Sequence, residues 1–146
     1  PTNLYGPNDN FSENDSHVIP GLIHRMHQAK ANKDTKFKIW GSGKPLREFL
    51  YVDDLANAIK FLILENVKED LLNIGSGKEI SIKDLAIEIS KIIDYKGEIE
   101  FDNSKPDGNP RKLLDSSKIN KIGWSHKVSL EDGLRKTYSW YLDNIS

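Results

Sequence analysis

The stretch IWGSGKPLREFLYVDDLA, residues 39–56, indicates an α/β fold more clearly than any other part of the chain. It begins at the end of a short apolar run, residues 37–40, which predicts a strand. Gly41-Ser42-Gly43 is a turn signal, and residues 47–52 again favour extended structure. Asp53 and Asp54 then begin a helix, because carboxylates suit the positive amino end of a helix. This single stretch therefore predicts two strands, a turn and the start of a helix.

Strands and helices alternate along the rest of the chain as well. Short apolar or alternating runs predict further strands at residues 71–74 and 98–101, and a polar loop at 102–112. The remaining helices are predicted to begin at capping residues, two of which have an aspartate three positions later. These capping residues are Ser16, Ser81, Asp115 and Ser129. The helix after Ser16 has Pro20 in its first turn, and the helix after Asp115 is predicted to end at Gly123. We expect one α/β domain over residues 1–146.

Apolar residues at helical spacing predict the core-facing side of each longer helix. The predicted core residues, helix by helix, are Val18, Ile19, Leu22, Ile23 and Met26; Leu55, Ala58, Ile59, Leu62 and Ile63; Ile82, Leu85, Ala86, Ile89, Ile92 and Ile93; and Leu130, Leu134, Tyr138, Tyr141 and Leu142.

Composition restricts the classes of function. A hydrophobic fraction of 37% and a charged fraction of 29% are ordinary for a globular domain of 146 residues. The net charge of -1 gives no basic field for nucleic acid or an anionic membrane, and no apolar run is long enough to span a bilayer. Cysteine is absent, which excludes disulfides and thiolate metal sites within the chain and fits a cytoplasmic location.

No self-sufficient catalytic or cofactor motif is present. The two Gly-Ser-Gly triplets, residues 41–43 and 75–77, lack the third glycine of a dinucleotide-binding loop and are interpreted as turns. There is no G-x-S-x-G elbow and no H-E-x-x-H motif. His24 and His27 could share a helix face, but no carboxylate or thiol accompanies them, so no metal site is expected.

Five stretches, in order and spacing, resemble GDP-L-fucose synthases. The pieces PTN-YGP and REF-YVDD are shared with many extended short-chain dehydrogenases/reductases that act on nucleotide sugars. The combination of SHVIP, WGSG-P-REF and KPDG-PRK is narrower and indicates a fucose synthase. The stretches are PTNLYGPNDNF (1–11), SHVIPGLIHRMHQA (16–29), IWGSGKPLREFLYVDDLA (39–56), FDNSKPDGNPRKLLD (101–115) and SLEDGLRKTYSWYL (129–142).

The resemblance implies the C-terminal, substrate-binding part of an NAD(P)-binding Rossmann-type enzyme. The family converts GDP-4-keto-6-deoxy-D-mannose to GDP-L-fucose by 3,5-epimerisation and NADPH-dependent 4-keto reduction, as a homodimer. Its glycine-rich loop, Tyr-x-x-x-Lys set and catalytic cysteine match nothing here, and the chain starts at Pro1 as if inside a fold. We therefore expect that the Rossmann half, which would bind most of the NADPH and form the dimer, lies outside this chain, and that the chain alone is inactive.

The resemblance also implies roles for individual residues. His17 matches the histidine that acts as acid and base during epimerisation, and imidazole chemistry suits that role near neutral pH. The substrate-binding candidates are Arg25, Trp40, Arg47, Asp107 and Lys112; the candidates on the nicotinamide side of the cofactor are Pro1, Thr2, Asn3, Leu4 and His17.

Several alternatives remain open at this stage. Each candidate arginine or lysine could be a solvated surface residue, His17 could simply begin a helix, and Trp40 could pack in the core. For the whole chain, the alternatives are another nucleotide-sugar epimerase or dehydratase, or a stand-alone nucleotide-sugar binding module without catalysis.

Overall fold

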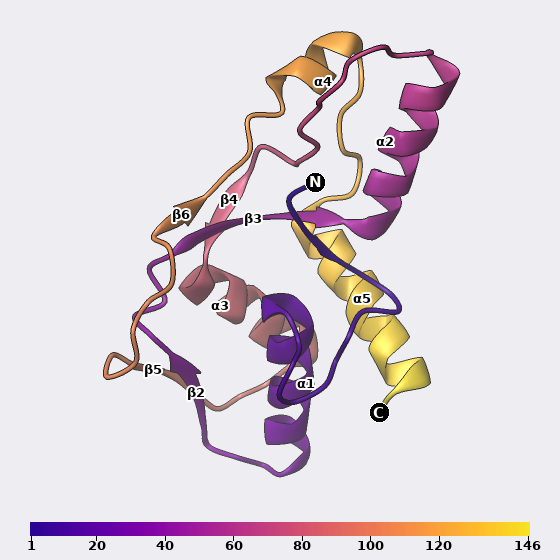
Figure 1. Cartoon of the computed structure of the whole chain (residues 1–146). Helices are drawn as coiled ribbons and strands as arrows, with labels where there is room; N and C mark the ends of the chain where they lie inside the picture. Colours follow the sequence, from indigo (N-terminus) through magenta and orange to yellow (C-terminus); the bar gives the residue numbers. More distant parts are fainter.

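The computed structural model describes residues 1–146, and its main sheet is built around β3 (Leu46–Tyr51) (Figure 1). The first half of β3 pairs with the antiparallel β4 (Glu79–Ser81) and the parallel β6 (Arg111–Lys112). Its second half pairs in parallel with β1 (Asn3–Tyr5), which lies at one end of the strand order. A separate parallel pair joins β2 (Lys36–Trp40) to β5 (Glu98–Asp102). The predicted α/β class is confirmed.

Three of the five helices form the main core together with the inner face of the sheet. These are α1 (Val18–Ala31), α3 (Ile82–Ile93) and α5 (Leu130–Asn144), which lie together on one side of β3 in Figure 1. Their apolar stripes meet in one cluster, in which Met26, Leu85 and Tyr141 are fully buried. None of the helices combines the length and the apolar character that a membrane crossing requires.

The other two helices, α2 (Val52–Leu64) and α4 (Ser117–Ile122), lie at the opposite end of the molecule (Figure 1). Beneath them is a second and much smaller core cluster. Its buried members are Leu50, Ala58, Ile74, Ile119 and Trp124.

Local capping signals are largely confirmed. Ser81 Oγ accepts a hydrogen bond from Asp84 N at 3.0 Å, and Ser129 Oγ accepts one from Asp132 N at 3.1 Å. Asp115 accepts from Ser117 N at 2.9 Å, so it caps α4 although Ser116 is the residue directly before that helix. The left-handed Gly123 ends α4 at φ +115°.

The prediction that Ser16 caps the first helix is wrong. Helix α1 begins at Val18, and the residue before it is His17, whose side chain makes no capping bond. Ser16 instead lies against Gly21, where an added Cβ would come 2.5 Å from the serine Oγ. The close approach of Ser16 to the first turn therefore requires glycine at position 21.

Several predictions of buried structure are also wrong. Residues 71–74 form no strand, because their only backbone bond to another segment is Thr2 N donating to Ile74 O at 3.0 Å. Within α2 only Asp54 and Ala58 are buried; Leu55 and Leu62 are partly buried against the second core, and Ile59 and Ile63 of the predicted apolar stripe face outward. Further differences are that Val18 and Leu142 are exposed and that β6 falls within the predicted loop 102–112.

Asp54 is a buried carboxylate that fixes a distant loop. It lies at the amino end of α2, and its two oxygens accept hydrogen bonds from Lys127 N at 3.0 Å and Val128 N at 2.9 Å. These bonds hold the segment that leads into α5. The aspartate therefore does more than complement the positive end of its own helix.

We expect Asp54→Asn to lower the free energy of unfolding by about 1–3 kcal/mol, because the amide places a donor against one of the two N–H groups that the buried carboxylate accepts from. Urea denaturation of the chain would measure the change. Asp53→Asn is the matched control, since Asp53 is the exposed neighbour, and it should change stability by less than about 0.5 kcal/mol. Equal effects of the two substitutions would contradict the role of Asp54.

Candidate functional site

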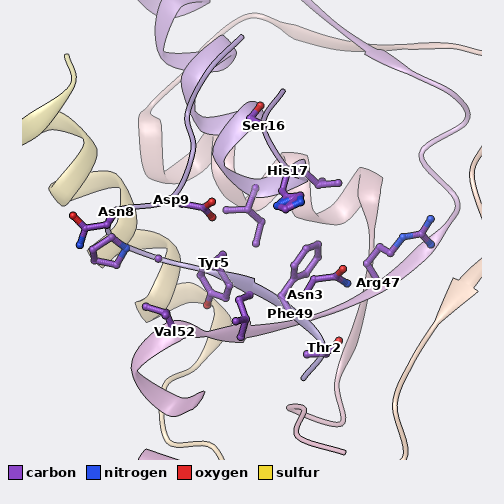
Figure 2. Close-up of a pocket in the computed structure, with 15 residues that line it drawn as sticks. Thr2, Asn3, Tyr5, Asn8, Asp9, Ser16, His17, Arg47, Phe49 and Val52 are labelled. Atoms are coloured by element: carbon purple, nitrogen blue, oxygen red, sulfur yellow. The ribbon is translucent and has the colours of Figure 1, made fainter. Parts of the chain in front are cut away.

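Two adjoining cavities lie between β1, β3, α1 and the loop that follows β5. The first has a volume of about 770 Å³ and is lined by residues from β1, β3 and the start of α1 (Figure 2). The second has a volume of about 540 Å³ and is lined by α1, the end of β2 and residues 106–108. Both volumes are in the range of small-molecule sites. The residues that line both cavities are Ser16, His17, Val18 and Arg47.

His17 lies where the two cavities meet. It precedes α1 with extended backbone (φ -70°, ψ 174°), and its side chain is exposed and makes no hydrogen bond to the rest of the chain. Figure 2 shows its imidazole beside Asn3 and Phe49 on the wall of the first cavity. Both ring nitrogens are therefore free to exchange a proton with a bound molecule.

β1 forms the floor of the first cavity. Thr2, Asn3 and Leu4 all line it, whereas Pro1 is exposed and lines neither cavity. Asn3 Nδ2 donates to Glu48 O at 2.8 Å and Thr2 Oγ1 donates to the same oxygen at 3.2 Å. These two side chains thus hold β1 against β3, and the Asn3 side-chain oxygen remains available as an acceptor in the cavity.

Arg47 extends from β3 toward both cavities and also holds the loop after β5. Its Nη1 donates to Leu46 O at 2.8 Å and to Asn109 O at 2.7 Å. Its Nη2 and Nε make no hydrogen bond within the chain. The guanidinium group can therefore hold the loop with one nitrogen and still present the N–H groups of its other two nitrogens to an anion.

Asp107 fastens the same loop to the turn after β2. Its carboxylate accepts from Ser42 N at 2.8 Å and Ser42 Oγ at 2.6 Å, and these bonds lower the pKa of the carboxyl below its ordinary value. Gly41 has φ +85°, and an added Cβ would lie 2.5 Å from Asp107 Oδ1. The predicted turn therefore needs glycine both for its backbone conformation and for this contact.

Arg25 and Trp40 both line the second cavity. Arg25 projects from α1, and its guanidinium carbon lies 5.4 Å from the centre of the Phe37 ring. Burial lowers the pKa of this guanidinium, but an arginine stays charged at neutral pH. Trp40 is 73% exposed at the end of β2, which excludes core packing, and Lys105 Nζ lies 5.7 Å from the centre of its ring.

Lys112, like Pro1, is a candidate that the structure does not bring to either cavity. It is exposed on β6 and lines neither cavity, although its backbone is in register with Arg47. Of the histidine pair, His24 Nδ1 lies 2.9 Å from Tyr141 OH and His27 Nδ1 lies 3.0 Å from Tyr138 OH. The structure contains no cluster of three or more His, Cys, Asp or Glu side chains that could hold a metal ion.

The structure also adds residues that sequence reasoning missed. Ser16 and Val18 flank His17 and line both cavities, and their position beside His17 was the available signal. Glu48 is fully buried and accepts from Gly77 N at 2.7 Å and Leu114 N at 3.1 Å. A glutamate inside a buried strand is the sequence signal for such an anchor.

The part of the chain that contains β1, α1 and β3 matches the model of a known protein family. Residues 1–75 match the NAD dependent epimerase/dehydratase family. The chain belongs to this family. Within it, GDP-L-fucose synthase 1 of Arabidopsis thaliana is 52% identical over 145 residues, which are 99% of this chain and 45% of that protein. GDP-L-fucose synthase of Escherichia coli K12 is 49% identical over 153 residues, which cover 99% of this chain and 48% of that protein.

A solved structure has the same fold over nearly the whole of this chain. The GDP-L-fucose synthetase of Naegleria fowleri bound to NADP superposes with a TM-score of 0.89 at 32% identity, over 97% of this chain and 45% of that one. The resemblance to GDP-L-fucose synthases is therefore confirmed. The chain spans just under half the length of the curated relatives it matches.

Proposed function

We propose that this chain is the substrate-binding part of a GDP-L-fucose synthase, which converts GDP-4-keto-6-deoxy-D-mannose to GDP-L-fucose. The observation that carries the proposal is the wall shared by the two cavities, which is lined both by His17, whose imidazole makes no hydrogen bond within the chain, and by Arg47. Relatives about half identical over nearly the whole chain carry the name GDP-L-fucose synthase.

The second cavity suits the nucleotide diphosphate of the substrate. Arg25 and Arg47 approach it from different elements, and guanidinium groups hold phosphate oxygens with paired hydrogen bonds. The exposed indole of Trp40 can cover an apolar sugar or base face. Asp107 holds the covering loop in place through Ser42.

The first cavity suits the nicotinamide end of NADPH. Asn3 offers a free carbonyl oxygen, Phe49 offers an aromatic face, and the volume of about 770 Å³ can hold a ring with its ribose. NADPH would supply the hydride for reduction of the 4-keto group. The sequence contains no glycine-rich loop for the phosphates, so we infer that most of the cofactor is bound by a Rossmann half outside residues 1–146.

The residues of this chain supply one of the two acid/base groups that epimerisation needs. The 4-keto group makes the protons on the two neighbouring sugar carbons acidic, and His17 can remove or return a proton there. The arginines hold the diphosphate so that the sugar extends toward the junction of the cavities. The second acid/base group, the tyrosine that protonates the reduced oxygen, and the homodimer contacts would belong to the Rossmann half. A cytoplasmic location fits the absence of cysteine.

The test compares the chain alone with a chimaera in which it replaces the matching segment of E. coli GDP-L-fucose synthase. We expect the chimaera to oxidise NADPH with the keto-sugar substrate and to form GDP-L-fucose, and the chain alone to do neither. Turnover by the isolated chain would contradict the proposal that this chain binds the substrate while the other half binds most of the cofactor. A chimaera that binds GDP-sugars but never turns them over would favour a binding module, and one that acts only on a UDP-sugar would favour another epimerase.

A further inference from the structure

The loop between β5 and β6, residues 103–110, is exposed along its whole length and yet forms part of the wall of the second cavity (Figure 1). Two side chains from outside the loop donate hydrogen bonds to it. Ser42 donates to the carboxylate of Asp107, and Arg47 donates to the backbone oxygen two residues later. The loop residues that line the cavity are Pro106, Asp107 and Gly108.

Ser42 holds the Asp107 carboxylate in one orientation. Its N–H donates to Oδ1 at 2.8 Å and its hydroxyl donates to Oδ2 at 2.6 Å, so both carboxylate oxygens are engaged. The serine Oγ also accepts from Lys44 N at 3.1 Å, which directs the hydroxyl hydrogen toward the carboxylate. Ser42 itself lines neither cavity, so it acts on a bound molecule only through the residues that it holds.

The turn that carries Ser42 is anchored to two elements of the fold. Gly43 O accepts from Lys83 N at 2.9 Å, in the first turn of α3. An added Cβ at Gly43 would collide with the ring of Phe101 in β5, so the turn packs directly against that strand. The hydroxyl therefore lies on a fixed support, whereas the loop that it fastens is exposed.

The same loop also sets the position of the Arg47 guanidinium group. Asn109 O accepts from Nη1 at 2.7 Å, and a Cβ added to Gly108 would come 3.3 Å from Nη2. The loop backbone thus lies directly against the guanidinium group. Because Asp107 immediately precedes these residues, release of its carboxylate from Ser42 would loosen the backbone that holds Arg47.

From this chain of contacts we infer that Ser42 is a positioning residue for the nucleotide diphosphate. Through Asp107 it fixes the loop, and through the loop it places the Asp107 carboxylate and the Arg47 guanidinium group on the wall of the second cavity. The inference rests on the proposed function for the identity of the ligand.

The experiment is calorimetric titration of the 146-residue chain with GDP. Ser42→Ala keeps the backbone donor and removes the hydroxyl, and we expect it to weaken binding roughly tenfold, the lower end of the effect of a hydrogen bond to a charged group. Ser42→Thr keeps a hydroxyl donor and should restore the affinity to within about twofold. Hydrogen exchange at residues 103–109 should become faster in the alanine variant and return to the original rate in the threonine variant.

A second background and a matched control separate positioning from general loop stability. Asp107→Ala removes the carboxylate, so adding Ser42→Ala to it should cost no further affinity. Ser104→Ala is the control, because Ser104 Oγ donates to Asp102 Oδ1 at 2.5 Å and neither residue lines a cavity. It removes a serine–aspartate bond at the same loop and should leave GDP binding unchanged. Circular dichroism would verify that each variant is folded.

Unchanged affinity in Ser42→Ala, failure of threonine to rescue it, or additive losses in the Asp107→Ala background would overturn the inference. So would an equal loss in Ser104→Ala, because Ser42 would then only stabilise the loop. A chain that binds UDP in preference to GDP would contradict the proposed function, and the same variants titrated with UDP would then test Ser42. Binding of neither nucleotide would overturn the positioning role, while turnover by the chimaera would decide the proposed function separately.

Discussion

Replacing His17 with glutamine is expected to slow solvent deuterium incorporation at the two sugar carbons beside the ketone by about 10²–10⁴-fold, the usual loss when a general acid/base is removed. Glutamine keeps a hydrogen-bond donor and similar bulk but cannot titrate. The side chain is exposed and makes no bond to the rest of the chain, so the substitution should not disturb folding. The measurement is exchange by mass spectrometry in the chimaera with E. coli GDP-L-fucose synthase.

Two comparisons separate chemistry from structure in this experiment. His126→Gln is the control, because His126 lines a separate small cavity beside β4 and should leave exchange unchanged. Reduction of an already epimerised keto-sugar should fall much less than exchange in the His17 variant. An unchanged rate of exchange would assign the proton transfer to another group, and an equal fall in both steps would mean that His17 only positions the substrate.

Features that depend on neighbours in the sequence could be predicted. The capping boxes at Ser81 and Ser129 are confirmed because the serine and its aspartate are three residues apart and form the bond within one turn. The Gly41-Ser42-Gly43 turn is confirmed for a similar reason, since the backbone needs φ above zero at both glycines. In each case the partner groups lie within a few residues of each other.

Features that depend on distant partners could not be predicted. The resemblance implies a substrate role for Asp107, and it gives no sign that the carboxylate also accepts hydrogen bonds from Ser42, 65 residues earlier. Asp54 was interpreted as a helix-start residue, and its oxygens bind a loop more than 70 residues away. A carboxylate in a sequence shows that hydrogen bonds are needed, but the tertiary fold decides which N–H groups supply them.

The apolar stripe of α2 illustrates a different limit. The helical spacing of Ala58, Ile59 and Ile63 predicts that these three residues are buried in the core. Only Ala58 is buried within this chain. Periodicity describes the helix face and not its partner, so exposed members of a predicted core indicate where a further surface belongs. The candidate site was more predictable, because most of its residues come from β1, the start of α1 and β3, which are short stretches of the recognised motifs.

Arg47→Lys is expected to weaken binding of GDP to the chimaera by about 2–5 kcal/mol, as measured by calorimetric titration. The arginine uses Nη1 to hold Leu46 O and Asn109 O, its remaining nitrogens make no hydrogen bond within the chain, and the residue lines the second cavity. A lysine ammonium is a single point charge, so it cannot hold the loop and present a planar pair of donors to a diphosphate at once. NADPH affinity should stay near that of the unsubstituted protein.

The size of the loss distinguishes this role from that of an ordinary surface arginine, which is worth about 0–1 kcal/mol in an exposed ion pair. Arg111→Lys supplies that reference, because Arg111 lies on the neighbouring β6 and pairs with Glu79 at 2.7 Å outside both cavities. Titration with guanosine then separates the two tasks of Arg47. If the diphosphate is its ligand, affinity falls for GDP and hardly changes for guanosine. An equal fall for both ligands would mean that Arg47 acts only through the loop at Asn109, and Arg25 would then become the better candidate for the phosphate contact.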